Sequence, residues 1–122
     1  MLPAHLRLKR SSDFKRVYRF GRRIEGRRLV LYYYFSKLPA LRFGFSISRK
    51  IGKATQRNRC KRLLSAVCYK NNQRFKPGHD VVIVVKEDIN SLHYREVEKE
   101  VLKLAEKAKL LLKINKEVSK LR

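Results

Sequence analysis

The residues of this chain best suited to chemistry are cations, and they gather between Ser46 and Ser65 in the stretch SISRKIGKATQRNRCKRLLS. From Gly26 to His79 the chain has 14 Arg and Lys residues and no Asp or Glu. A folded domain cannot neutralise such a charge internally, so the pattern predicts a positive surface for an anionic partner. The alternative is a solvated basic helix face, which is what most charge runs are.

The spacing in this stretch predicts an α-helix that buries one face and leaves the other free to bind. From a start near Thr55, the expected N-cap, a turn of about 100° per residue brings four apolar residues into one arc: Cys60, Leu63, Leu64 and Val67. The other sides carry Arg57, Asn58, Arg59, Lys61, Arg62, Ser65 and Tyr69. Lys50 and Lys53 come just before the helix, where the free N–H groups of its first turn also favour a phosphate.

The overall charge points to nucleic acid. The 122 residues include 32 basic and 10 acidic side chains, for a net charge of +22 and a pI near 10.7. Nucleic acid is therefore the first candidate partner and an anionic membrane the second. The length predicts a single domain, residues 1–122. The apolar runs LVLYYYF and VVIVV are too short to span a bilayer and no secretory signal is visible, so we expect a cytoplasmic protein.

No catalytic centre is visible among the residues. Cys60 and Cys68 would lie about 12 Å apart along the predicted helix, too far for a disulfide, and are expected to be reduced core residues. The three histidines are scattered and no Cys-x-x-Cys occurs, so no zinc site is expected. No paired carboxylates near the basic stretch could hold a metal for phosphodiester cleavage. The residues predict a nucleic-acid binder without a catalytic centre of its own.

Two elements are predicted before the basic stretch. Residues 1–10 read as a basic N-terminal arm with little to bury, and the serine pair at 11–12 can cap a helix over residues 13–20. On that helix Phe14 and Tyr18 share a face. They are either core residues or, with Lys and Arg around them, a platform for stacking bases.

Two predicted strands follow. Residues 29–35 are apolar or aromatic on both faces, so either both faces are covered or a tyrosine-bearing face is open for a ligand. In residues 42–50, RFGFSISRK, Phe and Ile occupy one face and Gly44, Ser46 and Ser48 the other. The Gly/Ser face either lines a shallow groove or is a plain solvated strand face.

The remaining chain predicts a covered strand and a long helix. Residues 81–85, VVIVV, lack polar alternation, which is typical of a central strand, and they suggest a parallel β-α-β unit with the preceding strand and helix. Asn90 or Ser91 can cap a helix whose apolar residues recur every three or four positions as far as Leu112, with Glu–Lys pairs three apart on its outer side. Residues from about 113 to 122 are expected to fray.

A series of motifs runs through the chain in a fixed order. It comprises DFKRVY at residues 13–18 with Gly21 after it, LVLY at 29–32, RFGFSISRKIG at 42–52, and RNR at 57–59 followed by KRL at 61–63. Asp80 with its apolar strand, and Leu92 and Tyr94, occur later in the same order. Together these motifs resemble the protein component of bacterial ribonuclease P over nearly the whole chain. The RNR segment after KIG is the most specific of them.

The resemblance implies a fold and a division of labour. The fold is a small α+β domain in two layers, with a mixed sheet backed by helices and a left-handed β-α-β crossover, against the usual right-handed preference. The partner is a catalytic RNA, which removes the 5′ leader from precursor tRNA by metal-dependent hydrolysis and holds most of the Mg²⁺. The protein is an accessory subunit with no activity expected alone, no membrane contact and no obligate protein partner.

The resemblance also assigns two binding surfaces. The residues expected to bind the catalytic RNA are Lys53, Arg57, Asn58, Arg59, Lys61 and Arg62. The residues expected to bind the leader of precursor tRNA are Phe14, Tyr18, Tyr32, Ser48, Arg49, Lys50 and Lys86. The chain departs from the family at Ser65, where another Arg is common, and at Tyr18, where Phe is common.

Two other functions compete with this hypothesis. A ribosomal or other structural RNA-binding protein would fit the charge equally well. A self-sufficient nuclease is disfavoured because the acid cluster that would hold its metal is missing.

Overall fold

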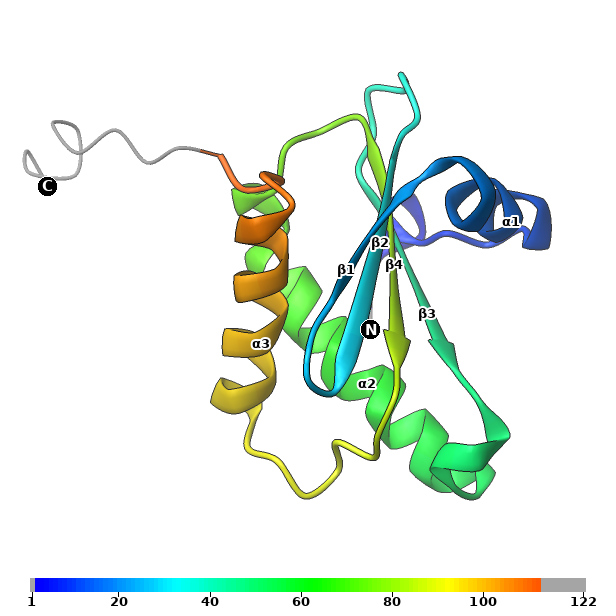
Figure 1. Cartoon of the computed structure of the whole chain (residues 1–122), viewed down its shortest axis with the longest axis vertical. Helices are drawn as coiled ribbons and strands as arrows, with labels where there is room; N and C mark the ends of the chain where they lie inside the picture. Colours follow the sequence, from blue (N-terminus) through cyan, green and yellow to red (C-terminus); the bar gives the residue numbers. More distant parts are fainter. Residues whose placement is uncertain (1, 113–122) are drawn as a thin grey trace, which may run out of the picture.

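A four-stranded mixed sheet forms the centre of the computed structural model, which describes residues 2–112 (Figure 1). Its strands are β1 (Arg22–Glu25), β2 (Leu29–Phe35), β3 (Arg42–Ile47) and β4 (His79–Val85). Their spatial order is β1-β2-β4-β3, with β4 antiparallel to β2 and parallel to β3. The last strand in the chain is thus a central strand of the sheet, as its unbroken apolar run predicts.

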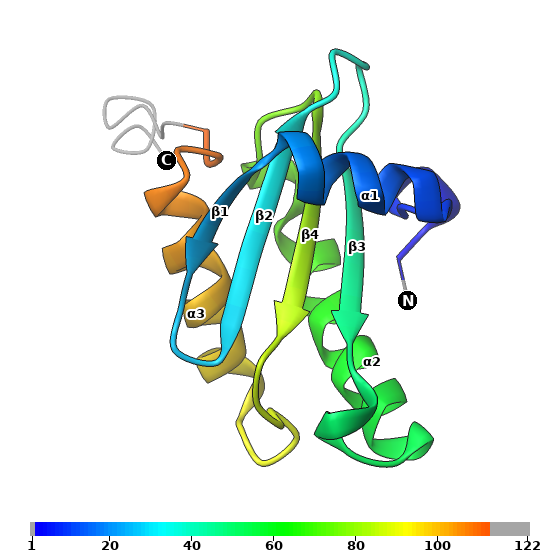
Figure 2. The same cartoon turned by 45° about the vertical axis from the view of Figure 1, so that its right-hand side comes forward.

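Helices lie on both faces of the sheet. α2 (Ala54–Asn71) and α3 (Tyr94–Lys107) lie on one face, and α1 (Ser11–Phe20) crosses the other (Figures 1 and 2). Figure 2 shows β3 and β4 pointing the same way, with α2 behind them and β4 to the left of β3. This path is a left-handed β-α-β crossover. The α+β class and the uncommon hand that the resemblance implies are therefore both confirmed.

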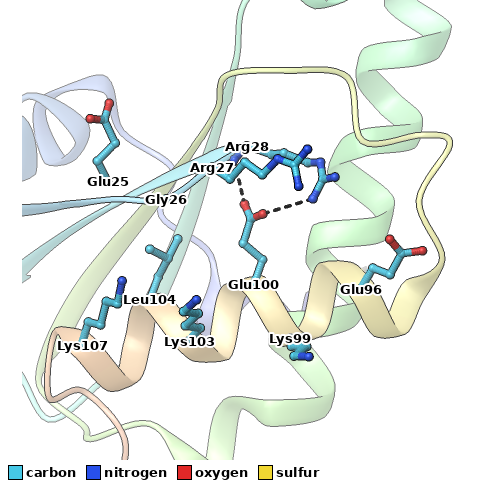
Figure 3. A pocket seen from close by; sticks show the side chains of 10 residues that line it. All are labelled: Glu25, Gly26, Arg27, Arg28, Glu96, Lys99, Glu100, Lys103, Leu104 and Lys107. Carbon is cyan, nitrogen blue, oxygen red and sulfur yellow. Dashed lines mark hydrogen bonds and ion pairs between the residues drawn. The ribbon is translucent and has the colours of Figure 1, made fainter.

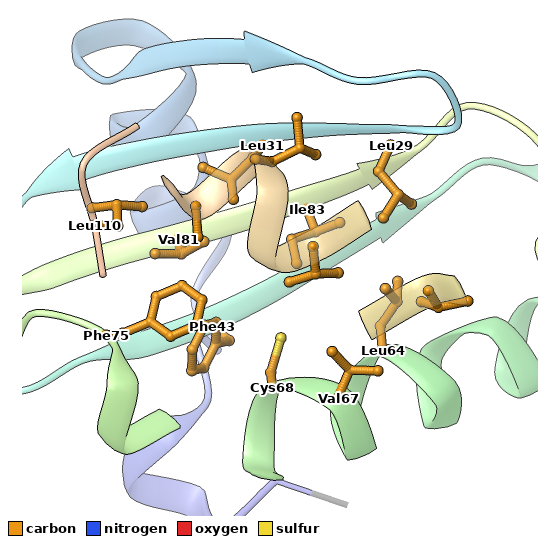
Figure 4. Close-up of a cluster of buried hydrophobic side chains, with 14 of the residues drawn as sticks. Leu29, Leu31, Phe43, Leu64, Val67, Cys68, Phe75, Val81, Ile83 and Leu110 are labelled. Atoms are coloured by element: carbon orange, nitrogen blue, oxygen red, sulfur yellow. The ribbon is translucent and has the colours of Figure 1, made fainter. Parts of the chain in front are cut away.

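The main core fills the space between the sheet and helices α2 and α3 (Figure 4). Alternate strand residues and one stripe of α2 meet there, including Leu29, Leu31, Phe43, Val81, Ile83, Cys60, Leu64, Val67 and Cys68. The stripe predicted for α2 is confirmed, with Leu63 half-buried at its margin. Both cysteines are free thiols. A smaller cluster of Leu8, Val17 and Val82 lies under α1 on the opposite face.

The first ten residues bury more than the sequence predicts, which corrects the expectation of an arm with little to bury. Leu2, Leu6 and Leu8 are all buried, while the basic residues between them stay exposed. The Leu8 N–H donates to the carbonyl of Phe43 at 2.8 Å, so this segment lies along the free edge of β3. The sequence did not predict this burial, because the three leucines are interspersed with basic residues and do not form an apolar run.

The start of α1 also differs from the prediction. Its N-cap is Arg10, without a side-chain hydrogen bond, so neither Ser11 nor Ser12 caps the helix. Phe14 and Tyr18 do share the face that lies toward the sheet, where Val17 between them is fully buried.

The last helix is shorter than its apolar periodicity predicts. α3 begins at Tyr94, where the N–H of the N-cap His93 donates to Glu96, and it ends at Lys107. Lys109 then adopts the left-handed conformation at φ 59°, and Leu111 pairs with Phe75 outside any helix. The apolar spacing of the sequence extends beyond the end of α3 because Leu110, which follows the helix, is also a buried core residue. The tail expected to fray from about residue 113 lies outside the described residues.

Candidate nucleic-acid interface

Four cations of α2 have no carboxylate partner among residues 2–112, whereas Lys70 at its far end pairs with Glu98 at 3.5 Å. Arg59, Lys61 and Arg62 are exposed and Arg57 is half-buried. None of these four side chains lies within 4.0 Å of a carboxylate of residues 2–112. A polyanion can bind such cations without first breaking an internal ion pair. The helix face that the sequence predicts as free is therefore free in the fold.

One side of this face opens into a shallow hollow. Arg57, Asn58 and Lys61 line it together with Phe45 and Ile47 at the end of β3, and its volume is about 210 Å³. Arg57 and Lys61 are four residues apart, so their side chains lie on one face of the helix, one turn from each other. The hollow joins the cationic face of α2 to the end of the strand that precedes it.

The entry to α2 differs in detail from the prediction. The helix begins at Ala54, and its N-cap is Lys53 and not Thr55. The side-chain oxygen of Gln56 accepts from the Lys53 N–H at 2.7 Å. Lys53 is exposed and, as the N-cap, adjoins the first turn of the helix, where the dipole favours an anion.

Ser48 and Ser65, before and within α2, lie in different environments. Ser48 and the exposed pair Arg49 and Lys50 form a tight turn before α2, in which the Ser48 hydroxyl accepts from the Lys50 N–H at 3.3 Å. Ser65, in contrast, was assigned to the free face of α2 and is only 4% exposed. That assignment is wrong, because a helix packed against both a sheet and a second helix buries more than one stripe.

The face of the sheet opposite α2 and α3 brings three of the seven predicted leader residues together, Phe14, Tyr18 and Tyr32. The register places Tyr32, Val82 and Gly44 side by side across β2, β4 and β3. The ring of Phe14 lies directly on Gly44, where an added Cβ would be 2.6 Å from the ring. Only glycine at position 44 allows α1 to approach this closely. The predicted Gly/Ser groove is thus partly filled by Phe14 at its upper end.

The aromatic pair on this face is divided between packing and exposure. Tyr18 and Tyr32 meet edge to face, with ring centroids 4.9 Å apart and an interplanar angle of 85°. Tyr18 is 39% exposed, while Phe14 and Tyr32 are half-buried. Each ring therefore packs on one side and offers another to solvent, so the three rings are not wholly core residues.

Below these rings the face is polar and open. Ser46 lies beside Val84, and Ser48 and Lys86 follow the carboxyl ends of the parallel strands β3 and β4. The Lys86 ammonium contacts both Glu25 Oε1 and the carbonyl of Gly26 at 3.3 Å. Its hydrogen bond, with Arg23 contributing, holds the pKa of Glu25 below its usual value. The ammonium group of Lys86, which was predicted to bind the leader, is thus already paired with the carboxylate of Glu25. The sequence did not indicate this ion pair.

Comparison with known proteins bears on this arrangement. Residues 2–109 match the family model described as Ribonuclease P. The chain is 38% identical over 103 residues to the ribonuclease P protein component of Pelotomaculum thermopropionicum, covering 84% of this chain and 92% of that one. It is 35% identical over 115 residues to the one from Clostridium acetobutylicum, covering 93% and 97%. The chain belongs to the bacterial ribonuclease P protein family.

Solved structures agree on the fold. The Staphylococcus aureus RNase P protein superposes with a TM-score of 0.79, covering 88% of this chain and 98% of that one at 23% identity. The Thermotoga maritima RNase P protein superposes with a TM-score of 0.76 and covers 83% and 96%. Because the family match and the relatives above identify the family, the chain is a subunit of ribonuclease P, and the ribosomal alternative is not supported.

A buried ion network that sequence reasoning missed holds α1 on the sheet of this ribonuclease P protein. Arg42 donates to both carboxylate oxygens of Asp80, at 2.9 and 2.8 Å, and lies 3.6 Å from Asp13, which also pairs with Arg16. The Asp80 side chain is 1% exposed. The hydrogen bonds from Arg42 to Asp80 raise the pKa of the guanidinium. The available signal was an aspartate at the start of a buried strand, which requires a cationic partner.

The two cysteines and the acidic side chains can be checked for chemistry of their own. Burial raises the pKa of both the Cys60 and the Cys68 thiols, which makes them poor nucleophiles. Nowhere in residues 2–112 do three His, Cys, Asp or Glu side chains come close enough to share a metal ion. None of the helices within that range is long and apolar enough to cross a bilayer.

A separate hollow of about 510 Å³ lies between α3 and the turn that joins β1 to β2 (Figure 3). Glu100 accepts from the Arg28 backbone N–H at 3.2 Å and lies 3.6 Å from its guanidinium. The sequence had paired Glu100 with Lys103, and that ion pair does not form. Glu96 and Glu100 offset part of the charge of this hollow, unlike the acid-free face of α2.

Proposed function

We propose that this ribonuclease P protein binds the catalytic RNA through α2 and the 5′ leader of precursor tRNA on the open face of the sheet. The observation that carries the proposal is the arrangement of two separate surfaces. Within residues 2–112, one consists of cations that have no carboxylate within 4.0 Å, and the other of half-exposed aromatic rings bordered by polar and basic residues. The RNA performs the hydrolysis, and the protein raises the affinity for leader-bearing substrate.

The α2 surface suits a folded RNA. Arg57, Arg59, Lys61 and Arg62, with Lys53 and Asn58 beside them, present donors to phosphate oxygens, and arginine can bind a phosphate through two parallel hydrogen bonds. Binding through phosphates releases counterions, so this contact should be strongly salt-dependent. Shape and backbone are what proteins mostly recognise in double-stranded RNA.

The sheet surface suits a single strand. Bases can stack on Phe14, Tyr18 and Tyr32, at about 1 to 3 kcal/mol per base, with little dependence on sequence. Ser48 offers a hydroxyl, and the cations of Arg49, Lys50 and Lys86 can neutralise the strand's phosphates. A leader is unpaired RNA, so these contacts would distinguish precursor tRNA from mature tRNA.

Magnesium is assigned mainly to the RNA in this proposal. The acids nearest to the sheet surface already have cationic partners, since Asp13 and Asp80 contact Arg42 and Glu25 contacts Lys86. Hard oxygen ligands of the RNA phosphates are the remaining donors that Mg²⁺ prefers. The proposal places the protein in the cytoplasm, where bacterial tRNA precursors are made.

Reconstitution tests the function directly. Purified protein is added to a bacterial ribonuclease P RNA at low Mg²⁺, and cleavage of precursor tRNA is followed by gel electrophoresis. We expect faster cleavage than with RNA alone, and none with protein alone. Absence of stimulation would contradict the proposed role, and cleavage by RNA-free protein would show that the protein has its own catalytic centre. A gel shift of precursor tRNA with and without the RNA separates binding from cleavage.

A further inference from the structure

Exposed aromatic side chains gather at the upper end of the sheet, outside both proposed surfaces. Phe20 is 65% exposed and Phe35 is 57% exposed. With Arg22, Tyr34 and His79 they line a hollow of about 250 Å³, called the aromatic hollow below, which Gly21 and Tyr33 complete. A cavity of about 150 Å³ can hold benzene, so this hollow has room for a planar ring. Singly exposed apolar residues are normal on protein surfaces, whereas exposed apolar side chains that gather around one hollow are typical of interaction sites.

The aromatic hollow forms where α1 ends against the unpaired last residues of β2. β1 begins its pairing with Arg22 opposite Tyr33, so the last two residues of β2 have no neighbour on that side. α1 ends directly at this free edge, and a Cβ on Gly21 would lie 2.5 Å from the Tyr33 carbonyl oxygen. The close approach that glycine allows holds Phe20 beside the open edge. On the other side the rings of Phe35 and His79 lie 5.3 Å apart.

The charge around the aromatic hollow is positive. The Arg19 guanidinium lies 5.3 Å from the centre of the Phe20 ring, and Arg22 is exposed. Neither arginine is within 4.0 Å of a carboxylate in the described part of the chain. The nearby Asp80 is already bound by Arg42. Aromatic rings flanked by unpaired guanidinium groups are the combination that binds unpaired nucleotides, because rings stack bases and cations bind phosphates.

We propose that the aromatic hollow binds an unpaired base of RNA, as a third contact beyond the two surfaces above. Tyr34 follows Tyr32 by two residues on the same face of β2, about 7 Å along the strand. The aromatic hollow therefore lies next to the sheet surface proposed for the leader. A second protein copy is the weaker occupant, because two chains of charge +22 repel each other and the hollow's own flanks are cationic. The inference requires an RNA-binding protein but not a role in cleavage.

A histidine resonance can test this contact at the site itself. Of the three histidines, only His79 lines the hollow, and the variant His79→Gln assigns its ring signals in a proton NMR spectrum. A short oligoadenylate should shift the His79 signals through the ring current of a stacked base, and an abasic oligomer of equal length should not. The shift should persist in Phe14→Ala, which removes one stacking ring from the sheet surface but leaves the aromatic hollow unchanged. It should be lost in the double variant Phe20→Ala/Phe35→Ala.

Affinity provides the second readout. We expect the double variant to bind oligoadenylate at least about fivefold more weakly, corresponding to the loss of one stacked base. Leu38→Ala is the matched control, since Leu38 is 48% exposed, lies nearby and does not line the hollow. Unshifted His79 signals, or an equal response to the abasic oligomer, would overturn the proposal. A dimer seen in sedimentation that disappears in the double variant would assign the hollow to protein contact instead.

The source of the base is then separated with the reconstituted holoenzyme. If the base comes from the leader, the double variant should lose affinity only for precursor tRNA with longer leaders. If it comes from the catalytic RNA, the double variant should bind that RNA more weakly without any substrate. An unchanged affinity in both measurements would overturn the proposal, even if stimulation of cleavage confirms the function proposed above.

Discussion

The arginines of α2 and the arginine of β3 have different environments within one small fold. On α2, Arg57, Arg59 and Arg62 have no carboxylate within ion-pair distance among the described residues. On β3, Arg42 contacts two aspartates, one of them fully buried. The first group offers its charge to a partner, and the second uses its charge to fix α1 over the sheet.

This difference shows that a cation's role depends on whether an acid reaches it in space. Arg42 and Arg49 are seven residues apart in the same basic segment, yet only Arg42 meets Asp80, which lies 38 residues further along the chain. The aromatic face depends on that contact, because α1 carries both Phe14 and Tyr18. One region thus binds through unpaired charge, and the other binds through rings that a buried ion pair keeps in place.

The largest effect is expected from breaking the buried pair. Arg42→Ala leaves the carboxylate of Asp80 buried without its partner, which should lower the free energy of unfolding by about 3 kcal/mol. Chemical denaturation followed by circular dichroism measures this loss. Arg49→Ala, at an exposed position, is the control and should change stability by less than about 0.5 kcal/mol. Equal stability of the two variants would show that the network does not hold α1.

The opposite result is expected on α2. Replacing Arg57 and Arg62 together with Ala should leave the free energy of unfolding almost unchanged but weaken binding to the catalytic RNA. Each lost phosphate contact should lower the slope of log affinity against log salt by roughly 0.7 to 0.9. Filter binding at several salt concentrations measures the slope. A slope equal to that of the unmodified protein would remove these residues from the RNA contact.

The aromatic face should respond through substrate choice. Phe14→Ala removes one stacking ring, so the preference of the holoenzyme for leader-bearing over mature tRNA should fall by about fivefold or more. The ratio of the two affinities corrects for any loss of folded protein. Tyr69→Ala is a control, because Tyr69 is an exposed aromatic residue on α2, away from the aromatic face. If Phe14→Ala and the α2 double variant changed the same property, the division into two regions would be wrong.

The smallest effect is expected at Glu25. Glu25→Gln frees the Lys86 ammonium for RNA, which should raise leader affinity by no more than about fivefold. Because Lys86 lowers the folded-state pKa of Glu25 from 4.5, the stability that this pair contributes is present above pH 4.5 and is lost as the pH falls through the lowered value. Denaturation of Glu25→Gln and the unmodified protein should therefore converge at low pH. A decrease in leader affinity would show that Lys86 does not bind the leader.

Local patterns in the sequence were sufficient to predict much of the fold. The apolar run of residues 81–85 predicted a central strand, and the stripe Cys60, Leu64 and Val67 predicted the buried side of α2. Both follow from periodicity, which depends only on neighbours in the chain. The left-handed crossover came from the family resemblance alone, because general preference favours the other hand.

The predictions that failed depend on contacts between distant residues. Ser65 is buried because α2 packs against two elements, and the Leu2 segment is buried because it reaches the edge of β3. The pairing of Lys86 with Glu25 joins residues 61 apart in sequence. No local pattern contains such contacts, so the sequence did not indicate which cations are already paired with an acid.

The position of β4 has a consequence for synthesis of the chain. β2 and β3 are not neighbours, and β4 must insert between them before the sheet exists. During translation, roughly 40 residues separate the end of β3 from the end of β4, which corresponds to about 2 to 8 seconds at bacterial elongation rates. α2 is synthesised within that interval, so the cationic helix exists before the strand that completes its sheet. A nascent polypeptide of this charge is therefore open to contact with RNA before its own fold is complete.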